Sequence, residues 1–120
     1  MDHHYNYGLV SVVIPAYNAE NYIKGSIESV IKQTYPYSEI IIVDDGSSDN
    51  TINVVKSIND NRIRLIEHTQ NKGPGAARNT AITVAKGKWI ALLDADDQWL
   101  PQRLEILLKI LDKSGPGYFI

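Results

Sequence analysis

Short apolar runs alternate along this chain with longer segments in which apolar residues recur at helical spacing. Runs rich in β-branched residues predict strands over residues 9–14, 39–43, 63–67 and 88–93. Each run is followed by a segment with the period of an amphipathic helix. This β-α-β-α-β-α-β-α order predicts an α/β fold: an open, mainly parallel, twisted sheet with helices on both faces and right-handed crossovers.

The four helices should begin and end near residues that favour caps and turns. Pro15 is expected to end the first strand, and Pro101 suits the first turn of the last helix. The helices are predicted over about residues 19–33, from the turn at Asp45–Gly46 to Asn59–Asn61, over about residues 76–85, and from Pro101 onward. Their expected buried faces are Ile23, Ile27, Val30 and Ile31; Ile52, Val55 and Ile58; and Leu104, Leu107, Leu108 and Leu111.

The 120 residues suffice for one small domain. We expect residues 1–8 to form a flexible N-terminus and residues 9–120 to form a single folded unit. Residues 114–117 break the last helix and residues 118–120 begin another apolar run, so the domain is expected to be truncated. Truncation would expose apolar surface, and we therefore expect a homo-oligomer.

Charge and composition exclude several classes of site. Twelve Lys and Arg against 14 Asp and Glu give a net charge of −2, without a basic patch, which argues against nucleic-acid binding. The chain contains no run of 18 apolar residues, so the sequence does not predict a membrane span. The chain has no cysteine, which excludes disulfides and thiolate metal sites. His3 and His4 are assigned to the terminus rather than to a metal site.

Carboxylates gather where two predicted strands end. Asp44 and Asp45 follow the second strand, and Asp94, Asp96 and Asp97 follow the fourth. Because ligands of open parallel sheets bind beyond the carboxyl ends of the strands, both groups should face one site. Crowded carboxylates repel one another unless a cation or a ligand offsets their charge. Mg²⁺ and Mn²⁺ prefer such oxygen ligands, together with waters and substrate phosphates.

Other residues at this edge have both a functional and a structural interpretation. Tyr17 follows the first strand and could pack on a nucleobase, or it could be a packed loop aromatic. Asp45 could accept hydrogen bonds from a base or ribose, or it could belong to a turn and cap. Gly73-Pro74-Gly75 could face a phosphate or be a turn into the third helix, and Arg78 could form a structural salt bridge.

Four motifs, in order, resemble those of family 2 glycosyltransferases. They are VSVVIPAYN at residues 10–18, IVDDGSSD at 42–49, NKGPGAARN at 71–79 and LDADD at 93–97. The likeness covers about residues 9–111. It implies a GT-A fold and transfer of a sugar from a nucleotide-diphosphate donor, often a UDP-sugar, with Mn²⁺ or Mg²⁺. The acceptor would be a glycan, a lipid or a protein.

The resemblance also implies roles for individual residues. Pro15 and Tyr17 would line the nucleotide site, Asp45 would contact the base, and Arg78 would face the donor. Asp94-Ala95-Asp96 would be the DxD motif, in which Asp96 is the expected metal ligand and Asp94 assists. Asp97 is an alternative ligand. The general base and the acceptor half of the family lie beyond this motif, so no catalytic base is assigned and residues 9–120 correspond to the donor-binding half.

Many relatives build cell-surface glycans, so the resemblance implies a cytoplasmic location with membrane association of the intact enzyme. A response-regulator receiver domain is an alternative, because Asp44–Asp45 and Asp94 resemble its acidic pair and phospho-acceptor. In that family, however, the pair follows the first strand, whereas a strand and a helix precede it here. A non-catalytic nucleotide-binding module is a third interpretation.

Overall fold

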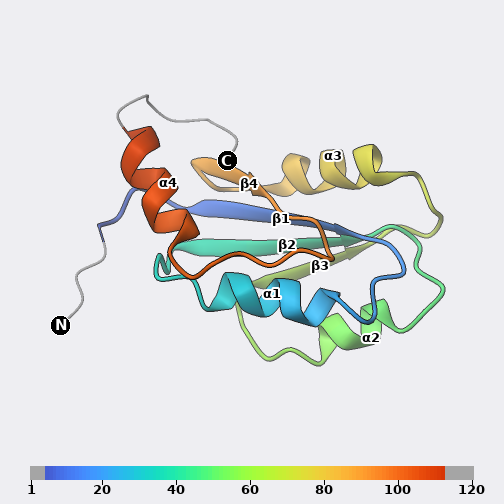
Figure 1. The fold of residues 1–120 in the computed structure, drawn as a ribbon. Coiled ribbons are helices and arrows are strands. Elements are labelled where there is room, and N and C mark those ends of the chain that lie inside the picture. The colour runs from blue at the N-terminus through green and yellow to red at the C-terminus, as the bar shows by residue number, and fades with distance from the viewer. Residues whose placement is uncertain (1–4, 113–120) are drawn as a thin grey trace.

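The computed structural model describes residues 5–112, in which strands and helices alternate as predicted (Figure 1). The expected breaker and apolar run after residue 113 lie outside the described residues. The strands are β1 (Val10–Ala16), β2 (Ser38–Asp44), β3 (Ile63–Glu67) and β4 (Trp89–Leu92). The helices are α1 (Ile23–Ile31), α2 (Thr51–Lys56), α3 (Pro74–Val84) and α4 (Arg103–Leu111).

All strand pairs are parallel, and the order in the sheet is β3-β2-β1-β4. The chain therefore moves from β1 outward through β2 to β3 and then crosses to the other side of β1. A right-handed crossover that runs in the opposite direction covers the opposite face of the sheet. Figure 1 shows this arrangement, with α1 and α2 on one face and α3 on the other. The strand order reverses between β1 and β4, and this switch point is where such sheets bind ligands.

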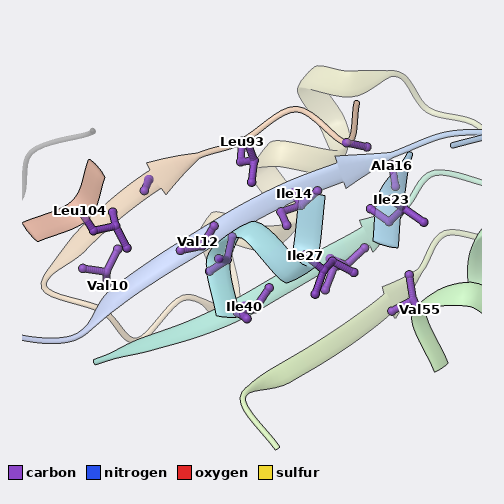
Figure 2. Packing of buried hydrophobic residues seen from close by; sticks show 14 of the residues in the cluster. Val10, Val12, Ile14, Ala16, Ile23, Ile27, Ile40, Val55, Leu93 and Leu104 are labelled. Carbon is purple, nitrogen blue, oxygen red and sulfur yellow. The ribbon is translucent and has the colours of Figure 1, made fainter. Parts of the chain in front are cut away.

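The sheet is buried on both faces, which explains why its central strands are almost continuously apolar. The strand pleat sends Val10, Val12 and Ile14 of β1 toward α1 and α4, where they join the larger core (Figure 2). The opposite pleat forms a smaller core beneath α3. Its fully buried members are Val13, Ile41, Val43, Ala77 and Ala81. The two alanines let α3 pack closely on β1 and β2, which places the start of α3 at the switch point.

Pro15 does not end the first strand, contrary to the prediction. The Val13 carbonyl accepts a hydrogen bond from the Leu93 N–H on the β4 side (3.0 Å), whereas Ala16 accepts one from Asp45 on the β2 side (2.8 Å). Because successive residues of a strand face alternate neighbours, Pro15 faces β4. Its missing N–H removes one hydrogen bond from that ladder only. The strand continues along β2, while β4 leaves the sheet directly before the acidic loop.

α1 and α3 begin at residues other than those predicted. α1 begins at Ile23 rather than near Ala19, because the N–H groups of Tyr22 and Ile23 both donate to the Ala19 carbonyl and form a turn first. α3 begins at Pro74 rather than at residue 76. Proline suits the first helical position, and Gly73 precedes it with a φ of 96°. The Gly/Pro segment is therefore mostly the first turn of α3.

The remaining predicted helices are shorter than expected. α2 ends at Lys56, before the predicted stop, and its buried residues are Thr51 and Val55. The Asp49 carboxylate accepts a hydrogen bond from the N–H of Thr51, the first residue of α2 (2.9 Å). α4 begins two residues after Pro101. Of the predicted apolar faces, Leu104 and Leu108 are buried, whereas Leu107, Leu111, Ile52 and Ile58 are half-buried.

Part of the expected flexible terminus contacts the core. The N–H of Tyr7 donates to the Tyr35 hydroxyl (3.0 Å), and the Tyr7 carbonyl accepts from Trp89 Nε1 (2.9 Å). Tyr7 is thus anchored to two buried aromatic side chains, while residues 1–4 lie outside the described residues. Within residues 5–112, no helix has both the length and the apolar character needed to cross a membrane.

Candidate functional site

The carboxyl ends of β1, β2 and β4 and the first turns of α3 surround an open pocket of about 290 Å³. Its lining residues are Pro15, Ala16, Tyr17, Asp45, Asn71, Pro74, Ala77, Arg78 and Asp94. Five residues predicted from the sequence, Pro15, Tyr17, Asp45, Arg78 and Asp94, thus line the same pocket. Adjacent pockets of about 390 and 330 Å³ share Pro15 and Asp94 with it and bring in Asp97 and Asp96, respectively.

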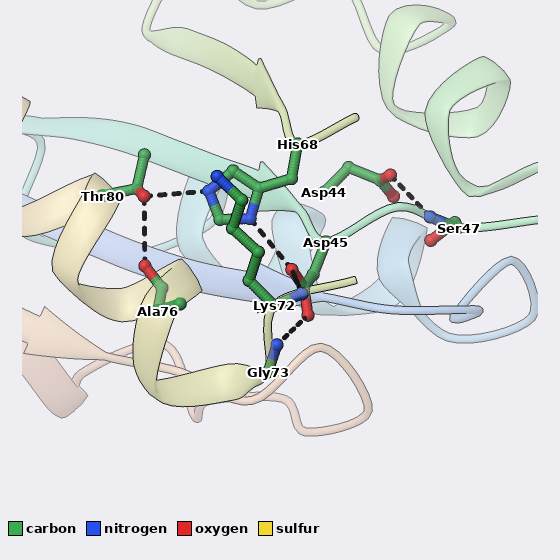
Figure 3. Close-up of polar contacts among 8 residues, drawn as sticks. All are labelled: Asp44, Asp45, Ser47, His68, Lys72, Gly73, Ala76 and Thr80. Atoms are coloured by element: carbon green, nitrogen blue, oxygen red, sulfur yellow. Dashed lines mark hydrogen bonds and ion pairs between the residues drawn. The ribbon is translucent and has the colours of Figure 1, made fainter. Parts of the chain in front are cut away.

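The Asp45 carboxylate is extensively hydrogen-bonded by the protein (Figure 3). Its Oδ1 lies 2.9 Å from His68 Nδ1 and accepts the N–H of Lys72 at 2.9 Å, while its Oδ2 accepts the N–H of Gly73 at 2.9 Å. The residue is only 2% exposed. Burial alone would raise the pKa of Asp45, but the hydrogen bonds from His68, Lys72 and Gly73 together hold that pKa below its ordinary value.

His68 is a site residue that the sequence analysis missed. Its side chain is 8% exposed, and its Nε2 lies 2.8 Å from Thr80 Oγ1 in α3 (Figure 3). The backbone N–H of His68 donates to the Asp44 carbonyl (2.8 Å), which places the imidazole directly beyond the end of β3. His68 directly follows the third predicted strand, so a search for polar residues at every strand end would have found it.

The acidic pair divides into two different roles. Asp44 is fully buried, and its Oδ2 accepts the N–H of Ser47 (2.9 Å), closing the turn after β2 (Figure 3). Its Oδ1 is buried without a hydrogen-bond partner among the described residues. Asp44 faces away from the pocket that Asp45 lines, so the turn is its visible function.

The acidic loop is held in shape by its backbone. The Asp94 carbonyl accepts hydrogen bonds from the Asp97 N–H (3.0 Å) and from the Ser26 hydroxyl of α1 (3.2 Å). Ala95 packs against the core, so the turn directs Asp94, Asp96 and Asp97 outward. All three are exposed, and one carboxylate oxygen from each lies within 4.8 Å of the others. Three exposed oxygen donors that leave room for phosphate and water fit Mg²⁺ or Mn²⁺.

Tyr17 and Arg78 are placed so that both can contact a ligand. Tyr17 is 52% exposed at the pocket, which does not fit a packed loop aromatic. Arg78 is half-buried on α3 and lines both the 290 Å³ and the 390 Å³ pockets. None of the ion pairs among residues 5–112 involves Arg78. Its guanidinium is therefore available between the 290 Å³ pocket and the acidic loop.

Acid should destabilise the fold through four carboxyl groups. The pKa of each of these groups is lowered in the folded state. For Glu39, Asp45 and Asp49, burial acts to raise the pKa, but hydrogen bonds outweigh burial. The pKa of Asp60 is lowered mainly by hydrogen bonding from Arg62. A carboxyl group whose pKa is lower in the folded state contributes its full stabilisation to the fold above the ordinary carboxyl pKa of about 4. This stabilisation is lost as the pH falls below that value.

We expect the melting temperature to change little between pH 7 and about 5 and to fall steeply below about 4, which thermal unfolding followed by circular dichroism will measure. Asp45→Asn should be less stable at neutral pH and less sensitive to acid, because one of the four groups no longer titrates. An unchanged acid dependence in that variant would contradict the role given to the Asp45 hydrogen bonds.

Comparisons with known proteins show which sequences and folds this chain resembles. Residues 11–120 match the family model described as Glycosyl transferase family 2. The chain is 46% identical over 110 residues to the UDP-Glc:alpha-D-GlcNAc-diphosphoundecaprenol beta-1,3-glucosyltransferase WfgD of Escherichia coli, a match that covers 92% of this chain and 44% of WfgD. It is 41% identical over 105 residues to the putative teichuronic acid biosynthesis glycosyltransferase TuaG of Bacillus subtilis, covering 86% of this chain and 42% of TuaG. The chain thus spans less than half the length of both relatives.

Solved structures share the fold. TarS of S. aureus in complex with UDP-GlcNAc superposes with a TM-score of 0.82 at 32% identity, covering 87% of this chain and 31% of the other. The mannosyltransferase PcManGT of Pyrobaculum calidifontis, in complex with GDP-Man and Mn²⁺, gives 0.74 at 31% identity and covers 86% and 31%. The receiver-domain alternative is not favoured, since the acidic pair follows the second strand and these similarities point elsewhere.

Proposed function

Because the chain belongs to glycosyltransferase family 2, we propose that its strand-edge pocket binds a nucleotide-diphosphate sugar as the donor of a transfer reaction. The observation that carries the proposal is the gathering of an exposed aromatic ring, a buried carboxylate, an arginine without an ion pair among residues 5–112, and an acidic loop around the switch point of the sheet. These groups are Tyr17, Asp45, Arg78 and the loop of Asp94, Asp96 and Asp97. Each matches one chemical part of such a donor.

The nucleotide base is proposed to enter the 290 Å³ pocket. Tyr17 would pack on the face of the base, while Asp45 accepts a hydrogen bond from its edge. Arg78 would bind the diphosphate between this pocket and the acidic loop, since guanidinium groups pair well with phosphate oxygens. UDP is the favoured nucleotide because WfgD is named for UDP-Glc and TarS was solved with UDP-GlcNAc. PcManGT was solved with GDP-Man, so family membership does not by itself select the base.

The acidic loop is proposed to hold Mn²⁺ or Mg²⁺, with Asp96 as the principal ligand and Asp94 and Asp97 beside it. A bound cation would offset diphosphate charge as the sugar–phosphate bond breaks. The chain itself supplies the oxygen donors and fixes their spacing through the Asp94–Asp97 turn. The complex of PcManGT with Mn²⁺ supports this part of the proposal.

The acceptor is proposed to be a glycan, a lipid-linked glycan or a protein, bound by parts of the protein outside residues 9–120. The name of WfgD specifies a diphosphoundecaprenol-linked acceptor, which makes a lipid-linked glycan the first to test. Such an acceptor would bring the intact enzyme to a membrane surface, with the donor site on its cytoplasmic side. The general base that deprotonates the acceptor hydroxyl is likewise expected outside this segment.

Calorimetric titration of UDP into the purified protein will test the donor site. With Mn²⁺ present we expect saturable binding at one site, and with EDTA we expect binding to weaken by about tenfold or more, because the diphosphate then meets three uncompensated carboxylates. UMP serves as the control, since it lacks the diphosphate that the cation would contact. Equal affinity for UDP with and without the metal would contradict the proposed cation site, and no UDP binding by the intact protein would contradict the donor site itself.

A further inference from the structure

We infer that His68 is a specificity-determining residue. By occupying one acceptor position of the Asp45 carboxylate, it leaves a single position free for a ligand. The pocket would therefore select a base with one N–H at its edge, such as uracil or thymine, over guanine. The inference rests on the proposed function, because it concerns how the base pocket would read its ligand. His68 would act only through Asp45, so its role is one of positioning rather than catalysis.

The acceptor capacity of Asp45 is nearly filled by the protein. A carboxylate can accept about four hydrogen bonds, about two at each oxygen. His68 Nδ1 and the N–H of Lys72 occupy Oδ1, and the N–H of Gly73 occupies one position on Oδ2. One acceptor position therefore remains, and it belongs to Oδ2. A ligand in the pocket can donate one hydrogen bond to Asp45 and no more.

The imidazole of His68 cannot turn away from Asp45 without losing a second contact. Its Nε2 lies 2.8 Å from Thr80 Oγ1, in the second turn of α3, and its side chain is almost completely buried (Figure 3). The Thr80 hydroxyl is itself held within 3.0 Å of the Ala76 carbonyl. Both ring nitrogens are thus engaged between β2 and α3, which keeps Oδ1 of Asp45 occupied.

The base edges differ in how many acceptors they need. Uracil and thymine present one N–H between two carbonyl oxygens, which matches a single acceptor flanked by donors, and Asn71 and Arg78 line the same pocket. Guanine presents two adjacent N–H groups beside one carbonyl, so a carboxylate would have to accept at both oxygens. Cytosine and adenine turn a ring-nitrogen lone pair toward the carboxylate. A buried polar group left without its partner costs affinity, so the pocket should reject these three bases.

Two substitutions of His68 separate its two contacts. In His68→Asn the amide nitrogen can take the place of Nδ1 and still donate to Asp45, while the contact with Thr80 is lost. In His68→Gln the longer side chain places its amide nitrogen near the position of Nε2, so Thr80 keeps a partner and Asp45 loses one. Each variant loses one buried hydrogen bond, so the two should be destabilised to a similar degree.

The experiment measures the dissociation constants of UDP, dTDP, GDP and CDP in Mn²⁺ for the intact protein and both variants. We expect the unmodified protein to prefer UDP to GDP by about 10- to 100-fold, the effect of one hydrogen bond to a charged group. His68→Gln should lower this preference to within about threefold of unity, and His68→Asn should retain most of it. Because both nucleotides are measured on the same sample, the ratio does not depend on the fraction folded.

The comparison of nucleotides and variants distinguishes the possible results. Binding of dTDP as tight as that of UDP supports recognition of the shared imide edge, and weaker dTDP binding supports uracil as the base, with the thymine methyl excluded. An unchanged UDP-to-GDP ratio in His68→Gln, or an equal loss of preference in both variants, would overturn the inference while leaving the donor site intact. Failure of the unmodified protein to bind any nucleotide would instead overturn the proposed function on which the inference rests.

Discussion

Replacing Asp96 by asparagine is expected to remove the metal dependence of UDP binding and to lower transferase activity of the intact protein by at least about 100-fold, since even second-sphere partners of metal ligands contribute about 10- to 100-fold to metal affinity. The substitution keeps the size of the side chain but removes the negative charge that a hard cation requires. Asp96 is exposed in the Asp94–Asp97 turn, whose hydrogen bonds use backbone atoms and the Ser26 hydroxyl. The loop should therefore keep its shape.

Asp94→Asn and Asp97→Asn are the matched comparisons, because each removes one carboxylate from the same exposed cluster. The free energy of unfolding of all three variants should lie within about 0.5 kcal/mol of that of the unmodified protein, as expected for surface positions. Each substitution also relieves like-charge repulsion. A loss of UDP binding in any of them can then be attributed to the site. Calorimetry with Mn²⁺ and with EDTA will rank the ligands. If Asp97→Asn abolishes the metal dependence and Asp96→Asn preserves it, Asp97 is the ligand.

The strands were well predicted because their burial leaves a direct trace in the sequence. β3 was predicted at its observed bounds, Ile63–Glu67, and the other strands differ by one or two residues at their ends. A central strand buried on both faces must be apolar throughout, whatever its neighbours are. Helix starts depend instead on which carbonyl each N–H meets, as at Ala19, and such partners follow from the tertiary fold rather than from periodicity.

The gathering of acidic residues at one edge of the sheet could be predicted from a single rule, whereas contacts that need a partner from elsewhere in the chain could not. Carboxylates directly after strands identified Asp45 and the acidic loop, which meet at the switch point. His68 also follows a strand directly, but the rule was applied to carboxylates only, and both of its ring nitrogens are engaged only because α3 brings Thr80 to Nε2.

A second set of buried polar contacts also left no signal in the sequence. Glu39 lies within an apolar strand, where its carboxylate accepts hydrogen bonds from the Ser11 hydroxyl and from the N–H of Lys86 (2.6 Å) and pairs with Arg64 (3.4 Å). These contacts join β1, β2, β3 and the segment after α3. A period-two pattern cannot reveal them, because the partners come from four separate segments of the chain.

The glycine after Asp45 couples the stability of the fold to the base pocket. Gly46 has a φ of 77°, a conformation that costs other residues about 1–2 kcal/mol. A Cβ built there would also lie 2.8 Å from the backbone nitrogen of Asn71 and 2.9 Å from the carbonyl carbon of Gln70. These are backbone atoms, so relief requires the segment to move, and the next two residues, Lys72 and Gly73, are those that donate to Asp45.

We expect Gly46→Ala to lower the free energy of unfolding by about 2–5 kcal/mol, the sum of conformational strain and overpacking. Two other glycines of the same edge separate these causes. Gly73 also has a positive φ (96°), in an extended region that other residues rarely adopt, but a Cβ there would meet no atom within 4 Å, so Gly73→Ala should cost only the strain, about 1–3 kcal/mol. Gly75 lies in the first turn of α3 with neither constraint, and Gly75→Ala should be neutral or stabilising by up to about 1 kcal/mol.

Denaturant unfolding of the three variants will measure this order, and UDP titration of Gly46→Ala at a temperature where it remains folded will measure the coupling. If displacement of residues 70–73 withdraws the two amide donors from Asp45, UDP affinity should fall together with stability. Gly75→Ala should bind UDP with unchanged affinity, because the substitution touches neither of the two backbone N–H groups that donate to Asp45. If Gly46→Ala unfolds at the same denaturant concentration as Gly75→Ala, the close approach of the β2 turn to the segment before α3 is wrong, and with it the geometry proposed to hold Asp45 in the pocket.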